Sequence, residues 1–191
     1  RKGNIVTYED FRDQMKKMAA AETKKRREEW DERRIDEAAW IIAEGAMKFG
    51  MLKQDNDRAI TFDMEEALSF DGFTGPYIQY SHARLSSILA KAGSQTVSVC
   101  QASDDPKEFA LLRLIADLPA TVAAAAETYR PSVLSQYLFE LAQASNEFYR
   151  DVPVLSAQDD VRVCRLAIVA AAKAALTRGL FLLGIRAPEE M

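Results

Sequence analysis

Glycine, proline, cysteine and histidine are all scarce: the 191 residues include 8 glycines, 6 prolines, 2 cysteines and a single histidine. So few helix breakers, separated by long alanine-, leucine- and charge-rich stretches, favour helices over turn-rich β structure. The two cysteines, Cys100 and Cys164, have no metal-ligand spacing and no second pair, which excludes a zinc site or a disulfide framework. We expect Cys164, within an apolar helical stretch, to be a buried thiol of a reducing compartment.

Recognisable catalytic motifs are also missing. The sequence contains no glycine-rich phosphate loop, no nucleophile–base pair and no metal-binding cluster, so it offers no catalytic and no metal-binding residue. No apolar run approaches the roughly 20 residues of a membrane span, and no signal peptide opens the chain. A net charge of -4 does not by itself indicate a nucleic-acid partner, because such domains are usually basic.

The remaining pattern predicts an all-α protein, a helical bundle with short loops preceded by a helical connector. Thr7, Asp63 and Thr74 are the expected N-caps of three helices. Ile5 and Val6 read as the end of a strand, and the segment 93–105 as the main irregular connection. The other expected helices cover Ile35–Phe49, Met64–Phe70, Pro106–Leu118, Ala120–Tyr129, Ser132–Arg150 and Asp160–Leu183.

A dense run of mixed charge extends from Lys16 to Glu37. Acids and bases alternate in nearly equal number, which favours a solvated helix with ion pairs between residues four apart. The alternative is a phosphate-facing surface, which would use the cluster Lys24, Lys25, Arg26 and Arg27.

The segment after Thr74 is amphipathic. On a helical wheel, Ile78, Leu85 and Leu89 share the core face. The opposite face carries Tyr80, Arg84, Ser87 and Lys91, with Tyr77 close to them. A tyrosine and an arginine four residues apart can stack on a base and neutralise a phosphate. The alternative is that Tyr80 packs on a neighbouring helix and Arg84 pairs with an acid.

The final helix and the tail carry structural patterns. A stripe of mostly small residues allows a neighbouring helix to approach closely; it comprises Val161, Cys164, Ile168, Ala171, Ala175, Gly179 and Leu182. Gly184 is expected to end the helix in a Schellman motif, with Ile185 folding back as its apolar contact. His82 lies nearer the core face of its own helix and is expected to be a structural histidine.

Three segments resemble one protein family. They are RKGNIVT at the start of the chain, GPYIQYSHARL from Gly75 to Leu85, and GLFLLGIRAPEEM from Gly179 to Met191. Together they resemble the C-terminal half of arginyl-tRNA synthetases, which are class I aminoacyl-tRNA synthetases with a DALR-type anticodon-binding domain. The HIGH motif, the KMS part of the second signature and the literal DALR tetrapeptide are absent.

The resemblance implies roles for individual residues. In the family, aromatic and basic residues at these motif positions contact the anticodon loop of tRNA(Arg); the matching residues are Tyr77, Tyr80 and Arg84. The terminal Met191 belongs to the same surface, while Glu189 and Glu190 would pair with basic residues. A further aromatic contact falls at Phe148–Tyr149; we assign it to Tyr149, although the pattern leaves open which ring faces outward.

The resemblance also implies a domain organisation. Residues 1–7 would end the signature-loop region of a catalytic core, 8–74 would be a helical connector, and 75–191 the anticodon-binding bundle. The intact protein would be a cytoplasmic ligase that uses ATP, with magnesium, and arginine. Besides tRNA(Arg), the partner of this fragment would be the missing catalytic core of the same protein. We expect neither a membrane nor a cofactor bound to the fragment itself. Two alternatives stay open, namely the anticodon domain of a related class I synthetase and a helical protein-interaction module without RNA binding.

Overall fold

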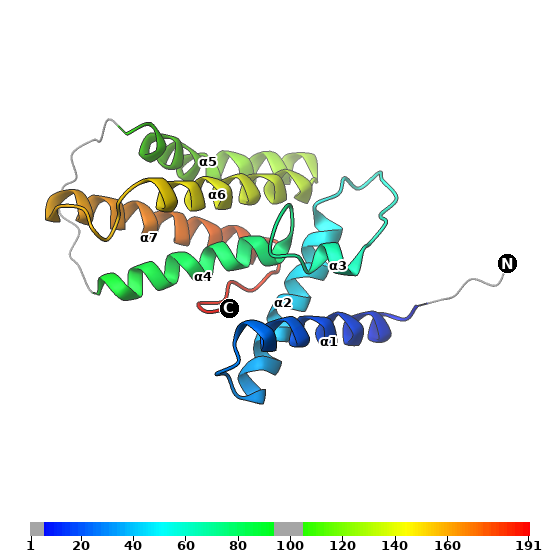
Figure 1. The fold of residues 1–191 in the computed structure, drawn as a ribbon. Helices are drawn as coiled ribbons and strands as arrows, with labels where there is room; N and C mark the ends of the chain where they lie inside the picture. Colours follow the sequence, from blue (N-terminus) through cyan, green and yellow to red (C-terminus); the bar gives the residue numbers. More distant parts are fainter. Residues whose placement is uncertain (1–5, 94–104) are drawn as a thin grey trace.

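The computed structural model describes residues 6–93 and 105–191, and all regular structure within these ranges is helical (Figure 1). The predicted all-α fold is therefore confirmed. In chain order the helices are α1 (Tyr8–Arg26), α2 (Glu32–Leu52), α3 (Met64–Ala67), α4 (Gly75–Ala92), α5 (Pro106–Thr128), α6 (Pro131–Asp151) and α7 (Asp159–Leu182). The expected strand residue Ile5 and Cys100 lie outside the described residues.

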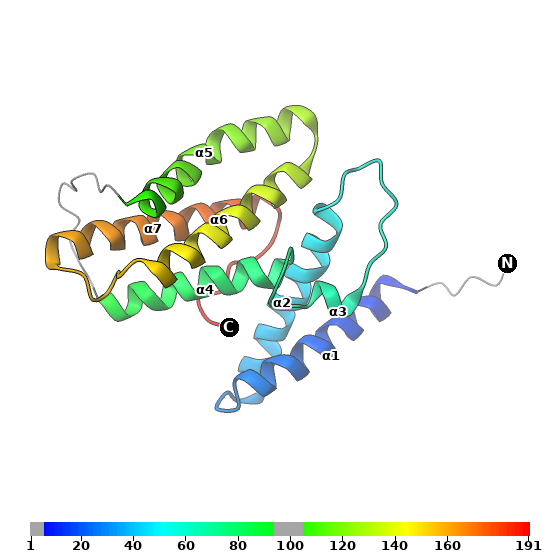
Figure 2. The same ribbon diagram turned by 45° about the horizontal axis from the view of Figure 1, so that its top comes forward.

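Helices α4 to α7 form a four-helix bundle. Helices α4 and α6 run in one direction and α5 and α7 in the other (Figures 1 and 2). The bundle core is aliphatic, with fully buried leucines such as Leu138, Leu141 and Leu176. Helices α1 and α2 form a separate antiparallel hairpin, held by a smaller core around Met15, and α2 packs against α4.

Two glycines set the contact between α2 and α4. A Cβ on Gly75 would lie 2.5 Å from the carbonyl oxygen of Gly45, so the two backbones touch where the helices cross. The fully buried Gln79, one turn further along α4, donates from Nε2 to the carbonyl oxygen of Ile41 at 3.1 Å. The same amide donates to the carbonyl oxygen of Arg186 at 2.9 Å, so it joins three segments.

The predicted caps agree with the structure. The Thr7 and Thr74 hydroxyls accept from the amides of Asp10 and Tyr77 at 3.2 Å each, and Asp63 accepts from Glu66 at 2.9 Å. The helix after Asp63 is shorter than expected, because it ends at Ala67.

Two predicted helix boundaries are wrong. Helix α5 continues through Pro119 from Pro106 to Thr128, where we expected two helices. Strong helix formers flank Pro119 on both sides, and they outweigh a cost of about 3 kcal/mol. The charged run is two helices and not one, because the chain turns at residues 27–31 and Asp31 caps α2 by accepting from Arg34 at 2.8 Å. The ion pairs Arg26–Glu22 and Arg33–Glu37 do join residues four apart.

The stripe predicted on α7 is only partly buried. Ile168 and Ala175 lie in the core, whereas Val161 and Leu182 at its ends are 42% and 48% exposed. Cys164 is half-buried and not buried as expected. The reason is geometric: a row of residues seven apart drifts by about 20° per repeat around a straight helix. The Schellman end is confirmed, since Gly184 has a φ of 68° and Ile185 donates to Leu180 at 2.8 Å.

Helix α5 covers the bundle with an apolar side that faces outward. Phe109 is 69% exposed and Leu112 is 45% exposed. Among the described residues, α5 is the one helix long and apolar enough to cross a membrane by length and composition, so the expectation that no apolar stretch approaches a membrane span is wrong for this helix. One side of α5 packs on the bundle core through residues such as Leu111, Leu114 and Leu118, while most of the helix stays accessible to solvent.

We predict that Gly75→Ala destabilises the protein, because the new methyl group would meet the backbone of Gly45. Overpacking of this kind costs about 1–3 kcal/mol, and urea unfolding followed by circular dichroism would measure it. The control is Ser87→Ala on the exposed face of α4. Equal unfolding free energies for the two variants would contradict the close crossing.

Candidate nucleic-acid interface

Five polar and aromatic side chains from α4 and α6 form a connected cluster. The Arg84 guanidinium lies 5.0 Å from the ring centroid of Tyr80 and donates to its hydroxyl at 3.1 Å. It also donates to the amide oxygen of Asn146 on α6 at 3.3 Å. The Asn146 amide nitrogen donates in turn to the Tyr77 hydroxyl at 3.1 Å and to Ser81 at 2.8 Å. All three predicted α4 residues are therefore brought together, and each is half-buried.

The charge of Arg84 has no carboxylate partner among the described residues; its guanidinium donates to a phenol and to an amide. The alternative in which Arg84 pairs with an acid is thus not observed. An arginine that is held in place without being neutralised keeps its charge for an anionic ligand.

Tyr80 is less outward-facing than the helical wheel predicts. Its ring packs edge-on against Phe70, with centroids 6.2 Å apart. Phe70 in turn lies beneath the guanidinium of Arg26 from the end of α1, at 4.3 Å. Two rings thus lie between two cations from α1 to α4, in the order Arg26, Phe70, Tyr80 and Arg84, and Tyr80 is held by packing against Phe70.

The burial of Phe148 and Tyr149, near the end of α6, shows which of the two rings faces outward. Phe148 is 1% exposed and belongs to the bundle core. Tyr149 is half-buried, and it lies three residues beyond Asn146 on the same helix. Of the two rings, Tyr149 is the one that a ligand can reach.

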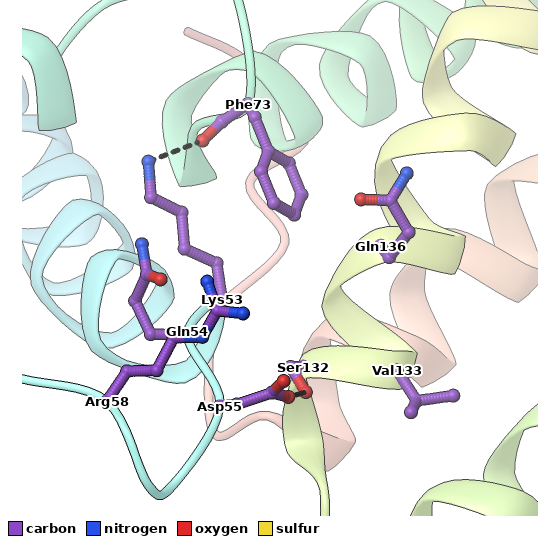
Figure 3. A pocket seen from close by; sticks show the side chains of 8 residues that line it. All are labelled: Lys53, Gln54, Asp55, Arg58, Phe73, Ser132, Val133 and Gln136. Atoms are coloured by element: carbon purple, nitrogen blue, oxygen red, sulfur yellow. Dashed lines mark hydrogen bonds between the residues drawn. The ribbon is translucent and has the colours of Figure 1, made fainter.

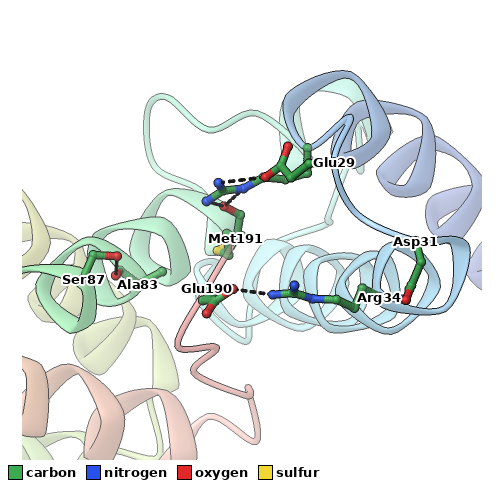
Figure 4. Close-up of polar contacts among 8 residues, drawn as sticks. Glu29, Asp31, Arg34, Ala83, Ser87, Glu190 and Met191 are labelled. Atoms are coloured by element: carbon green, nitrogen blue, oxygen red, sulfur yellow. Dashed lines mark hydrogen bonds and ion pairs between the residues drawn. The ribbon is translucent and has the colours of Figure 1, made fainter. Parts of the chain in front are cut away.

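The C-terminal tail passes between the bundle and the hairpin. The backbone oxygen of Met191 accepts from Nε of Arg27 at 2.8 Å, and Glu190 pairs with Arg34 at 2.5 Å (Figure 4). Glu189 pairs with Lys173 of α7 at 2.7 Å, which lowers the pKa of this carboxyl. Both glutamates thus pair with basic residues as expected, and the half-buried Met191 packs against the core of the hairpin.

His82 anchors this tail from inside the bundle. It is 1% exposed, its Nδ1 lies 2.8 Å from the carbonyl oxygen of Pro188, and its Nε2 lies 2.9 Å from the hydroxyl of Thr177. Burial lowers the pKa of the imidazole, so the neutral form is favoured. The structural role predicted for His82 is confirmed.

The family is decided by comparison with known proteins. The model of the DALR anticodon binding domain matches residues 78–191. The chain belongs to the DALR anticodon binding domain family. The matched range begins within α4 and includes the rest of the bundle and the tail, so Tyr80, Arg84 and Asn146 lie inside it, while Tyr77 lies just before it.

Curated relatives and solved structures are similar to the chain over most or all of its length. The arginine–tRNA ligase of Lactiplantibacillus plantarum is 41% identical over 82% of this chain and 28% of that protein. The enzyme of Methanocella arvoryzae is 39% identical over 100% of this chain and 34% of its own. The arginyl-tRNA synthetase structure of Thermus thermophilus matches with a TM-score of 0.92 and 37% identity, over 100% of this chain and 33% of that one. The chain therefore spans about a third of the length of the curated relatives it matches.

Three contributors to the candidate interface were not predicted as such from sequence. Asn146 and Phe70 complete it only through contacts across the fold, to Arg84 and Tyr80 respectively. Arg27 was predicted only as part of a basic cluster, yet it binds the backbone of Met191. Within the described ranges, no three acidic, histidine or cysteine side chains gather to hold a metal.

We predict that stability falls as the pH drops from 7.5 to 5.5. The pKa of His82 is lowered in the folded state from its ordinary 6.5, so below about 6.5 the unfolded chain binds the proton more readily than the folded one. Unfolding free energies measured across this range should decline. His82 is the single histidine, and the carboxyls with lowered pKa titrate at more acidic pH. His82→Gln should therefore flatten the decline, and an identical slope in this variant would contradict the assignment.

Proposed function

We propose that this chain is the anticodon-reading part of an arginine–tRNA ligase. The observation that carries the proposal is the Tyr80–Arg84–Asn146–Tyr77 cluster, in which an arginine without a carboxylate partner sits beside two accessible tyrosines. Membership of the DALR family and similarity to arginine–tRNA ligases support it. Residues 75–191 would read the anticodon loop of tRNA(Arg), and residues 8–74 would connect this bundle to a catalytic core.

The cluster suits a single-stranded RNA loop. The free parts of Tyr77, Tyr80 and Tyr149 would stack on unpaired bases, and Arg84 would contact a phosphate or a base edge. Met191, which packs against the core of the hairpin, would contribute an apolar contact, while Arg27 holds its backbone. Because the net charge is -4, attraction to RNA would come from this local arrangement and not from the whole molecule.

In the intact enzyme, ATP with magnesium and arginine would bind to a catalytic core that corresponds to the part of the relatives outside the matched region. The described residues contain no acidic, histidine or cysteine cluster for the metal. The role of this chain would be to position the tRNA, so that anticodon docking brings the acceptor end to the distant active site. Such an enzyme would work in the cytoplasm, with neither a membrane nor a cofactor of this domain required.

The direct test is binding to the anticodon stem-loop of an arginine tRNA, compared with the same stem-loop carrying a changed middle anticodon base. We expect tighter binding to the unchanged loop and a steep fall of affinity with salt, because phosphate contacts release counterions. Equal weak binding to both loops would contradict anticodon reading.

Tyr80→Ala should weaken stem-loop binding by about 1–3 kcal/mol, the contribution of one base stacked on an aromatic ring. Tyr80→Phe is the matched control, since it keeps the ring against Phe70 and removes only the hydroxyl that Arg84 contacts. Circular dichroism should show both variants folded. Full affinity in a folded Tyr80→Ala protein would refute the stacking role.

The chain by itself should form no aminoacyl-adenylate. ATP–pyrophosphate exchange, measured with arginine and magnesium, should stay at background, with a complete arginine–tRNA ligase as the positive control. Exchange activity that belongs to the purified chain would overturn the proposal that the catalytic core lies outside it.

A protein-interaction module is the second candidate, and the outward apolar side of α5 favours it. Phe109 and Leu112 are both exposed there. Binding through this side would be driven by apolar burial and would depend only weakly on salt, so the salt titration described above separates the two functions.

A further inference from the structure

A cavity of about 450 Å³ lies between the end of α2 and the beginning of α6 (Figure 3). One wall comes from the last turn of α2 and the following loop, and the opposite wall from the first two turns of α6. Phe73, just before α4, closes it between them. Its walls include Lys53, Gln54, Arg58, Phe73, Ser132 and Gln136.

The cavity walls are tied together by long-range hydrogen bonds. Asp55 accepts from the hydroxyl of Ser132 at 2.7 Å, which lowers the pKa of this carboxyl. Asn56 donates to the backbone oxygen of Tyr129 in the turn between α5 and α6, at 2.7 Å. Lys53 donates to the carbonyl oxygen of Phe73 at 3.1 Å. The loop after α2 is therefore held on the beginning of α6 and on the turn before it.

The lining offers several of the groups that bind a nucleotide. The Phe73 ring, with the Lys53 ammonium 5.6 Å from its centroid, can form a wall for a planar base. The amide of Gln54 can donate to and accept from the edge of the base, and the amide of Gln136, which donates to Glu140 at 2.8 Å, keeps its oxygen and one N–H for the same purpose.

Lys53 pairs only with the 69% exposed Glu66, at 3.3 Å, so its charge is weakly compensated. In the described part of the chain Arg58 makes no salt bridge, but it is close enough to the Asp55 carboxylate, which also lines the cavity, to contribute to the lowered pKa of that carboxyl. Its guanidinium is exposed and can meet a phosphate.

The cavity continues into the interface already described. The Phe73 ring packs on Phe139 of α6 with centroids 5.1 Å apart, and Phe139 packs on Tyr77 at 5.4 Å. On α6, Gln136, Phe139 and Asn146 follow each other at helical spacing along one face. An aromatic and amide-bearing strip thus connects the cavity with the Tyr77–Asn146 pair.

We propose that this cavity binds one further unpaired nucleotide of the RNA that the Tyr80–Arg84 cluster reads. The base lies against Phe73, its edge meets Gln136 and Gln54, and its phosphate meets Arg58. This inference rests on the proposed function and extends it to a second contact region. The occupant is unpaired, because a base held in a duplex cannot enter a recess between two helices.

Two variants test the cavity, each with a matched control on the same 191-residue chain. Arg58→Ala should weaken binding of the arginine-tRNA anticodon stem-loop roughly three- to ten-fold and reduce the salt slope by about 0.7 to 1. Its control is Arg113→Ala, which removes an exposed arginine from α5. Gln136→Leu keeps the side-chain size and removes the amide, and its control is Gln158→Leu at the exposed N-cap of α7. Neither control should change the affinity.

Fluorescence locates the nucleotide. With 2-aminopurine placed at each loop position in turn, one position should change its emission on binding to the parent chain and not on binding to Gln136→Leu. If Arg58→Ala and Gln136→Leu bind like the parent while Tyr80→Ala binds more weakly, the cavity proposal is overturned and the proposed function stands. If the parent does not bind the stem-loop at all, the proposed function itself fails.

A free nucleotide is the alternative ligand for the cavity, because it carries the same base and phosphate groups as RNA. Cytidine 5′-monophosphate titrated alone should show no saturable binding that depends on Arg58. If it does bind, and Arg58→Ala abolishes this while RNA affinity is unchanged, the cavity belongs to a free nucleotide and the proposal for RNA is overturned.

Discussion

The backbone contact between Gly45 of α2 and Gly75 of α4 is the constraint on which the arrangement of this protein depends. Neither position has room for a side chain, since a Cβ at Gly75 would lie 2.5 Å from the Gly45 oxygen and one at Gly45 would lie 2.6 Å from the Gln79 amide. Helices that approach this closely have a defined crossing point. The hairpin is therefore placed against the first turns of α4, which carry Tyr77 and Tyr80.

The tail reinforces this placement from the other side. After Gly184 reverses the chain, the segment crosses from α7 to the hairpin and is bound along the way by Gln79, His82 and Arg27. Most of these bonds are made to backbone oxygens, whose positions depend on the path of the chain and not on side-chain identity. A short irregular segment thus acquires a defined path, because buried polar groups must find partners.

The candidate interface shows how an acidic protein can present a site for an anion. Most bases on the hairpin are neutralised locally, as Arg26 is by Glu22 and Arg33 by Glu37. Arg84 differs, because its partners are the neutral Tyr80 and Asn146. An anionic ligand would therefore be attracted by the cations that lack an acidic partner, and the net charge does not show where these cations are.

Local sequence by itself determined the helices, their caps and their buried faces. Thr7, Asp63, Thr74 and Gly184 act where they were predicted, since caps and turns depend on backbone groups a few residues away. The break at Asp31 and the passage of α5 through Pro119 were missed, because both depend on a balance between propensity and packing. Only the tertiary structure decided that Asn146 joins Tyr77 to Arg84, that Phe70 fixes Tyr80, and that Phe73 closes a cavity. These contacts join residues from different segments of the chain. The local hydrophobic periodicity cannot predict them, because they depend on how α2, α4 and α6 pack against one another.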